Sequence, residues 1–201
     1  MTQPVHLGCR ALAALCAVAI WIGAGSAPVA AITTQDQPVS VRFTATAINM
    51  DPSVAVTATL VDFHVTRWST DAEREKLIGI LLDRGPDKLL RALQEIPRVG
   101  TMKTPDTLSY DLHYARETRE GSQDRVVLVT DRPIAYWETA YMSRTLQYPF
   151  TVVEMRLPSD GSDGEGKLTV ATKITADKSG QIVLENYSNA PVRLTKVRRE
   201  K

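Results

Sequence analysis

The stretch that decides the fold is TRWSTDAEREKLIGILLDRGPDKLLRALQEIPRV, Thr66 to Val99, the only long helical pattern beyond the first 31 residues. Thr70 and Glu73 fit a capping box, in which each side chain binds the backbone N–H of the other residue. Apolar residues then recur at three- and four-residue spacing, which predicts one buried face. Gly85 suits the end of this helix and Pro86 the start of a second one. The spacing therefore predicts a hairpin of two short helices that needs a partner surface.

Most of the remaining sequence has the pattern of β-strands separated by turns. Alternating or continuous apolar runs rich in β-branched residues predict strands, and clusters of Gly, Pro, Asp and Ser predict the turns between them. The four strands after residue 149 are expected to form an antiparallel meander, and residues 100–107 are expected to be a loop. The expected strands are 37–50, 54–68, 108–116, 125–130, 150–157, 167–176, 181–187 and 192–197.

Together these elements predict an α+β fold that is mostly antiparallel β. About eight strands would form a curved sheet, either a partial barrel or a two-sheet sandwich, with one helical hairpin inserted after the second strand. The helices are expected to cover one face of this sheet, because short amphipathic helices are marginal alone in water.

The first 31 residues predict a secretory signal peptide. Arg10 gives a weakly positive start, Ala11 to Ala24 is apolar but too short to span a bilayer comfortably, and Val29 to Ala31 is a small-residue cleavage site. A retained N-terminal anchor is the alternative. The expected mature chain is a single α+β domain, residues 32–201, exported to the periplasm or exterior of a bacterium with no stable membrane span.

Removal of the signal would change the chemistry available to the chain. Both cysteines, Cys9 and Cys16, lie in the signal, so the mature chain could form no disulfide and no cysteine-based catalytic or metal site. Arg10 is the only charged residue removed, which leaves 23 basic against 23 acidic residues. A chain without net charge has no general attraction for nucleic acid, so nucleic acid is not an expected partner.

An aromatic segment is the expected contact surface for a ligand or partner. Ile134 to Pro149 has neither a helical nor a strand period, and aromatic side chains with polar groups are enriched in binding sites. The alternative is that these aromatic residues cap the core. The expected binding residues are Tyr136, Trp137, Tyr141 and Tyr148, with Arg132 and Arg144 beside them.

Sequence signatures of several enzyme classes are absent, but two Asp-x-His patterns remain. The chain has no GxSxG, no Gly-rich phosphate loop, no HExxH and no dinucleotide fingerprint. Asp62 with His64, and Asp111 with His113, each share one face of a strand. Neighbouring strands in register would bring the four together as a candidate zinc site. Two solvated polar faces are the alternative, and no other cofactor is expected.

Three functions are compatible with these patterns. The leading prediction is a non-enzymatic binding or structural module that uses residues 136–148 to contact an unknown protein or small molecule. The second is a carrier of a small apolar ligand, in a cavity between helices and sheet lined by residues such as Leu77, Leu81, Leu90 and Phe63. The third is a metal-dependent hydrolase built on the two Asp-x-His patterns.

Four short runs resemble a group of small exported bacterial proteins. The runs are Arg67–Arg74, Asp131–Ile134, Leu184–Tyr187 and Pro191–Thr195, and the likeness covers most of the expected mature chain. The group has no assigned activity. The resemblance therefore implies export and a single domain, and it identifies no catalytic residue.

Overall fold

The computed structural model describes residues 39–48, 58–105, 108–132, 148–177, 181–186 and 192–200. Every described residue belongs to one compact unit, residues 33–201. The expected signal peptide, residues 1–31, lies outside the described residues. None of the helices in the described ranges has the length and apolar character needed to cross a membrane.

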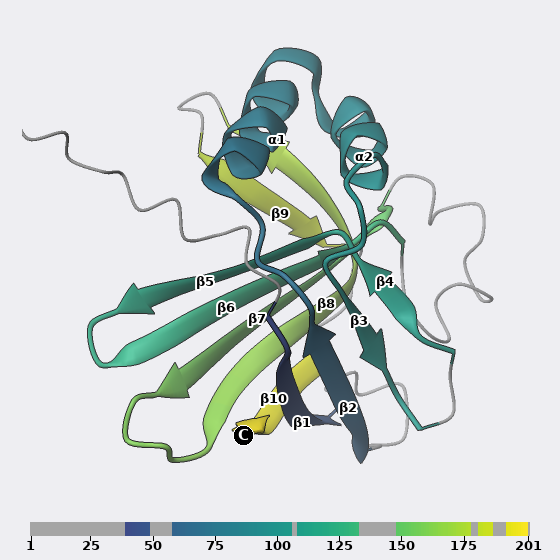
Figure 1. Cartoon of the computed structure of the whole chain (residues 1–201). Helices are drawn as coiled ribbons and strands as arrows, with labels where there is room; N and C mark the ends of the chain where they lie inside the picture. Colours follow the sequence, from purple (N-terminus) through teal and green to yellow (C-terminus); the bar gives the residue numbers. More distant parts are fainter. Residues whose placement is uncertain are drawn as a thin grey trace, which may run out of the picture. The chain divides into compact units, whose positions relative to one another are not determined.

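The described residues form a mostly antiparallel β fold with two inserted helices, which confirms the predicted fold class (Figure 1). The helical hairpin follows the second described strand, as expected. The strands are β1 (Val41–Ile48), β2 (Ala58–Val65), β3 (Gly100–Lys103), β4 (Tyr110–Leu112), β5 (Tyr114–Glu120), β6 (Gln123–Thr130), β7 (Phe150–Pro158), β8 (Gly164–Ala176), β9 (Ile182–Asn186) and β10 (Val192–Glu200), and the helices are α1 (Asp71–Arg84) and α2 (Pro86–Gln94).

The strands belong to one sheet that curls into a nearly closed barrel. Their order is β4-β3-β2-β1-β10-β8-β7-β6-β5, with β9 added to β8. The two ends of this order, β4 and β5, are consecutive in the chain and are separated only by His113. The His113 N–H donates to the Val129 carbonyl on β6 at 3.0 Å, whereas the Leu112 carbonyl accepts from the Val99 N–H beside β3 at 2.8 Å. One stretch of chain thus bonds to both ends of the sheet and brings them together.

The inward face of the sheet carries the main core. Residues that pair across neighbouring strands lie on the same face. Phe43 pairs with Phe63, which pairs with Met102, and on the other side of the sheet Val126 pairs with Met155. All five side chains are fully buried, so this face is the packed interior of the barrel.

The helical hairpin begins and turns where the sequence predicts. The Thr70 hydroxyl accepts from the Glu73 N–H at 3.1 Å, and the Glu73 carboxylate accepts from the Thr70 N–H at 2.9 Å, which is the expected capping box. Arg67 donates two hydrogen bonds to the same carboxylate, at 2.8 and 3.0 Å, and these lower the pKa of Glu73. Gly85, with φ of 80°, ends α1, and Pro86 opens α2. A side chain at Gly85 would be strained at that φ, so this turn favours glycine.

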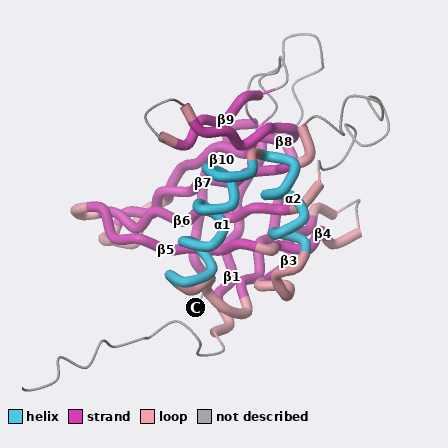
Figure 2. The backbone as a smooth tube through the Cα atoms, turned by 90° about the horizontal axis from the view of Figure 1, so that it is seen from above, coloured by secondary structure: helices cyan, strands magenta, loops and turns pink. Residues whose placement is uncertain are grey.

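The hairpin packs on the sheet by an apolar stripe and by one buried hydroxyl. Figure 2 shows both helices lying over the strands. Ser69, just before α1, is fully buried; its N–H donates to the Ala115 carbonyl at 2.7 Å, and its hydroxyl accepts from the Ala115 N–H at 3.1 Å. Ser69 therefore fixes the start of the hairpin to β5. The buried side chains of the helices are Leu77, Leu81, Leu89, Ala92 and Leu93.

Details of the strand prediction are wrong in three places, and the described sheet has ten strands rather than about eight. Residues 100–107, expected as a loop, contain β3, which joins β2 to β4. The expected strand 108–116 is divided at His113 into β4 and β5. The expected meander after residue 149 is broken, because β10 pairs with β1 and the first half of β8 while β9 pairs with the second half of β8.

Candidate functional site

A cleft of about 860 Å³ lies between the helical hairpin, the outward face of β5 to β8, and β9; it is called the helix–sheet cleft below. In Figure 1 the helices and β9 are seen above β5 and β6. The outward face is the one opposite the packed interior of the barrel. On it Tyr114 pairs with Val129, which pairs with Val152. The volume falls within the range of about 300–1,000 Å³ that is usual for small-molecule sites.

Apolar and aromatic side chains make up thirteen of the 21 described residues that line this cleft. They come from three separate parts of the chain, which meet only in the folded protein. The helices contribute Leu77, Ile78, Leu81, Leu89 and Leu93, the sheet contributes Tyr114, Val127, Val129, Phe150 and Val152, and the hairpin of β8 and β9 contributes Ile174, Ile182 and Leu184.

Charged and polar side chains line the rest of the cleft, and positive charge predominates among them. Basic residues number five and acidic residues two, so the described lining carries a net charge of +3. The basic residues are Arg74, Arg116, Arg119, Arg125 and Lys167, the acidic residues are Glu120 and Glu154, and Thr118 completes the set.

Glu154 is the centre of an ion-pair network on the outward face. Its carboxylate lies 3.0 Å from Arg125, 3.1 Å from Lys167 and 3.3 Å from Arg156. Burial works against ionisation of Glu154, but the hydrogen bond from Lys167 and the charge of Arg125 outweigh it and hold the pKa of this carboxyl below its ordinary value. One carboxylate thus serves three basic side chains, and the network keeps a surplus of positive charge.

A second group of polar residues lies where α1 begins. The Arg116 guanidinium donates to the Asp71 carboxylate at 2.6 Å, which raises the pKa of Arg116 and connects β5 to the first turn of α1. Tyr114 is half-buried in the cleft wall, and burial raises the pKa of its hydroxyl. The positive charges of Arg116 and Arg74 oppose that rise, so both guanidinium groups act on the same hydroxyl.

Two of the four residues expected to line an apolar cavity do line the cleft. Leu77 and Leu81 project into it from α1. Phe63 does not, because it lies on the inward face of β2 among the main core residues. Leu90 is only partly buried and packs against the core without reaching the cleft. The expected location, between helices and sheet, agrees with that of the cleft.

The aromatic segment lies mostly outside the described residues. Residues 133–147 are not described, and they include Tyr136, Trp137, Tyr141 and Arg144. The role of these four residues as a contact surface therefore stays a prediction. Arg132 and Tyr148 stand at its two described ends. The Arg132 guanidinium lies 4.9 Å from the centre of the Tyr110 ring, a cation–π distance. Neither Arg132 nor Tyr148 lines the helix–sheet cleft.

The two Asp-x-His patterns lie on strands that are not neighbours. His64 on β2 pairs with Thr101 on β3, and Thr101 pairs with Asp111 on β4, so β3 separates Asp62 and His64 from Asp111. Strands are about 4.8 Å apart, which places the two patterns roughly 10 Å from each other. Within the described ranges, no group of three or more His, Cys, Asp or Glu residues could hold a metal ion.

Each histidine instead has its own local partners. The His113 Nδ1 lies 2.8 Å from the Ile96 carbonyl, and its Nε2 lies 3.8 Å from the Asp131 carboxylate. The His64 Nε2 lies 3.1 Å from the Ser40 hydroxyl. His113 thus connects the end of α2 with the point where the sheet closes, which is a structural position.

Comparison of the chain with protein-family models, with characterised proteins and with solved structures finds no match. The resemblance to small exported bacterial proteins therefore stays a prediction.

The charged half of the cleft was not predicted from the sequence, although one signal was available. Glu154 is the only acid in the mostly apolar run FTVVEMRL, 150–157, and an acid within a buried strand usually has a charged partner. Its partners Arg125 and Lys167 could be identified only once β6, β7 and β8 were known to be neighbours.

Proposed function

We propose that this protein binds and carries a small, predominantly apolar molecule in the helix–sheet cleft. The observation that carries the proposal is the cleft itself, about 860 Å³ with a mostly apolar lining from helices, sheet and β9. Concave, apolar sites with a few polar groups are the usual form of small-molecule sites.

The exposure of apolar residues along β9 supports the same function. Ile182 and Leu184 line the cleft and are 46% and 36% exposed. An apolar ligand would bury part of this surface, and each buried CH₂ group contributes about 0.8 kcal/mol. Neighbouring apolar side chains exposed on one strand are more typical of a contact site than single ones are.

Binding of a neutral apolar probe tests the proposal. N-phenyl-1-naphthylamine, which fluoresces in apolar surroundings, is titrated into the protein, and 1-alkanols of increasing length are used to displace it. We expect saturable binding, and displacement that strengthens up to about fourfold for each added CH₂. Absence of saturable binding, or equal displacement by short and long alkanols, would contradict the proposal.

Two substitutions on α1 locate the binding site. Ile78 lines the cleft, whereas Leu82, one turn further along α1, is exposed and does not. A glutamate in an apolar site loses solvation, so Ile78→Glu should weaken probe binding at least about tenfold, while Leu82→Glu should leave it within about twofold. Equal effects of the two changes would place the site elsewhere. Both variants are checked for unchanged far-UV circular dichroism.

A further inference from the structure

We infer that the ligand of the helix–sheet cleft carries one anionic group, a carboxylate or a phosphate, at the end of its apolar chain. Arg74 and Arg116 would bind this group at the start of α1. The inference rests on the proposed function, because it concerns the polar end of a molecule whose apolar part occupies the same cleft.

Arg74 lies on the face of α1 that lines the cleft. Arg74, Ile78 and Leu81 all line the cleft at four- and three-residue spacing, so they follow one another along one face of the helix. A chain that packs against Leu81 and Ile78 reaches Arg74 at the beginning of the helix. Arg74 is exposed, so a head group at this position would stay in contact with water.

Arg74 acts together with Arg116 and Tyr114 at this end of the cleft. Both guanidinium charges act on the Tyr114 hydroxyl, as the opposing influences on its pKa show. All three side chains line the cleft. Two guanidinium groups and one hydroxyl offer several donors to the oxygen atoms of an anion, and guanidinium matches carboxylate and phosphate geometry.

Most of the basic side chains that line the cleft already have an acidic partner in the protein. Arg116 is paired with Asp71, and Arg125 and Lys167 share Glu154. Arg74 forms no ion pair with any residue in the described part of the chain. A bound anion would therefore be attracted most strongly at Arg74, because no acidic side chain of the described residues already neutralises that guanidinium. The two acids of the lining, Glu120 and Glu154, are both engaged by Arg125, so a cationic ligand would meet no acid without a basic partner.

Displacement of the neutral probe by matched ligands tests the inference. The ligands are 1-decanol, decanoate, decyl phosphate and decyltrimethylammonium, which share one chain and differ in the head group. We expect decanoate or decyl phosphate to bind at least about fivefold more tightly than 1-decanol, and decyltrimethylammonium to bind most weakly. The stronger of the two anions identifies the head group. Added salt should weaken only the binding of the anions.

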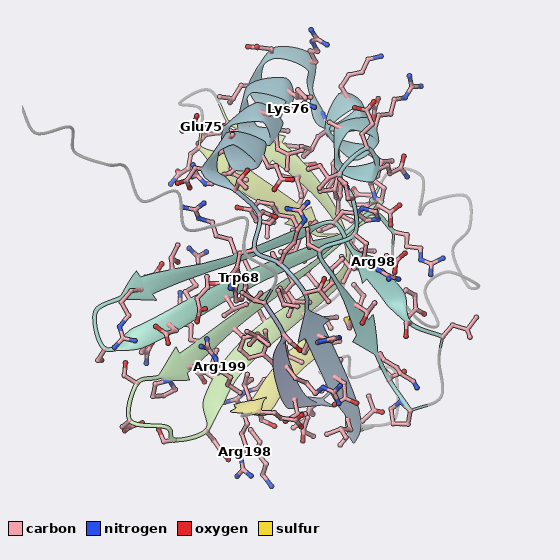
Figure 3. All side chains as sticks on the ribbon, in the orientation of Figure 1. Trp68, Glu75, Lys76, Arg98, Arg198 and Arg199 are labelled. Carbon is pink, nitrogen blue, oxygen red and sulfur yellow. The ribbon has the colours of Figure 1, made fainter. Side chains whose placement is uncertain are left out.

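Substitution of Arg74 locates the anion. Arg74→Gln should reduce the affinity for the preferred anion about fivefold and leave the affinity for 1-decanol unchanged. Lys76→Gln is the matched control, because Lys76, labelled in Figure 3, is exposed on the same helix and does not line the cleft. Both residues are on the surface, so both variants should fold.

The two proposals fail in different ways. If neither 1-decanol nor the anions displace the probe, the proposed apolar site falls, and the inference falls with it. If 1-decanol binds as tightly as both anions, or if Arg74→Gln and Lys76→Gln have equal effects, the inference is overturned while the proposed function stands.

Discussion

The charge of Glu73 makes the stability of the fold depend on pH. Hydrogen bonds from Arg67 hold the pKa of Glu73 below the ordinary value of about 4.5. The unfolded chain therefore takes up this proton at higher pH than the folded chain does. The stabilisation that the Glu73 carboxylate gives to the folded state is complete above the ordinary pKa of the unfolded chain. It is lost as the pH falls through the lower pKa of the folded chain. Glu73→Gln should lower the free energy of unfolding at pH 7, and its difference from the parent should shrink toward pH 3 in urea titrations.

A neighbouring glutamate provides the control for this prediction. Glu75, labelled in Figure 3, is exposed on the same helix, whereas the Glu73 side chain is 24% exposed and bound to Arg67. Glutamine at position 73 can still accept the hydrogen bond from the Thr70 N–H, so the substitution removes charge rather than the cap. A pH-dependent difference of equal size for Glu75→Gln would show that general helix charge, not the Arg67 pair, is responsible.

Two glycines have opposite roles in the elements that carry them. Gly79 lies inside α1, and a Cβ added there would meet nothing within 4 Å. Gly166 lies on β8, where an added Cβ would be 2.4 Å from the Glu154 carbonyl oxygen of β7. Gly79→Ala should therefore stabilise the protein by about 0.5–1 kcal/mol, because alanine favours the helix. Gly166→Ala should destabilise it by about 1–3 kcal/mol, since backbone must move.

Thermal and urea unfolding of the two variants measure these effects under the same conditions. The substitution is chemically identical at both positions, so a difference in sign reports only the local structure. A stabilising effect of Gly166→Ala would show that β7 and β8 are further apart than the structure places them. Destabilisation by Gly79→Ala would show that this side of α1 is packed against other residues.

The helical hairpin could be predicted from the sequence because its determinants are local. The capping box needs only Thr70 and Glu73, and the turn needs only Gly85 followed by Pro86. Strand β3 could not be predicted in this way. GTMK, 100–103, is only four residues long and has a single large apolar side chain, and it is a strand because β2 and β4 both bond to it.

The cleft was predictable in place but not in composition. Amphipathic helices beside a mostly antiparallel sheet indicate that Leu77 and Leu81 face the sheet, and both line the cleft. The run RVVLVT, 125–130, in β6 is apolar on both faces, so it cannot show which residues face the barrel interior. Pairing with β7 decides this: Val126 faces inward and Val127 faces the cleft. The arginines of the lining depend on the same long-range pairing.

Closure of the sheet also depends on contacts between distant parts of the chain. Arg199, near the end of β10, forms an ion pair with Glu117 on β5, although these strands are not neighbours in the sheet. Figure 3 shows Arg198 and Arg199 below the helices, at the end of β10. The Arg199 guanidinium also lies 5.2 Å from the centre of the Phe43 ring, on the inward face. The pair thus connects two distant strands across the curled sheet.

We therefore expect the backbone amides of the barrel to exchange with solvent slowly and those of β9 to exchange faster. The amides of Ser69, Val99 and His113 are hydrogen-bonded to the stretch 112–115 or from it to β6, where the two ends of the sheet meet. They should open only with the core strands. Among the described strands β9 pairs only with β8, and its apolar side chains are exposed. We expect the closure amides to exchange at least about a hundredfold more slowly than those of β9, a difference of about 3 kcal/mol in opening free energy.

The same measurement connects stability to ligand binding. Ile182 and Leu184 line the cleft, so an apolar ligand should slow exchange in β9 and leave the closure amides almost unchanged when binding is weak. Exchange of Val99 or His113 as fast as that of β9 would show that the barrel opens at its closure. In that case the ends β4 and β5 would separate before β9 does. Slow exchange throughout β9 without ligand would instead show that this wall of the cleft is already rigid.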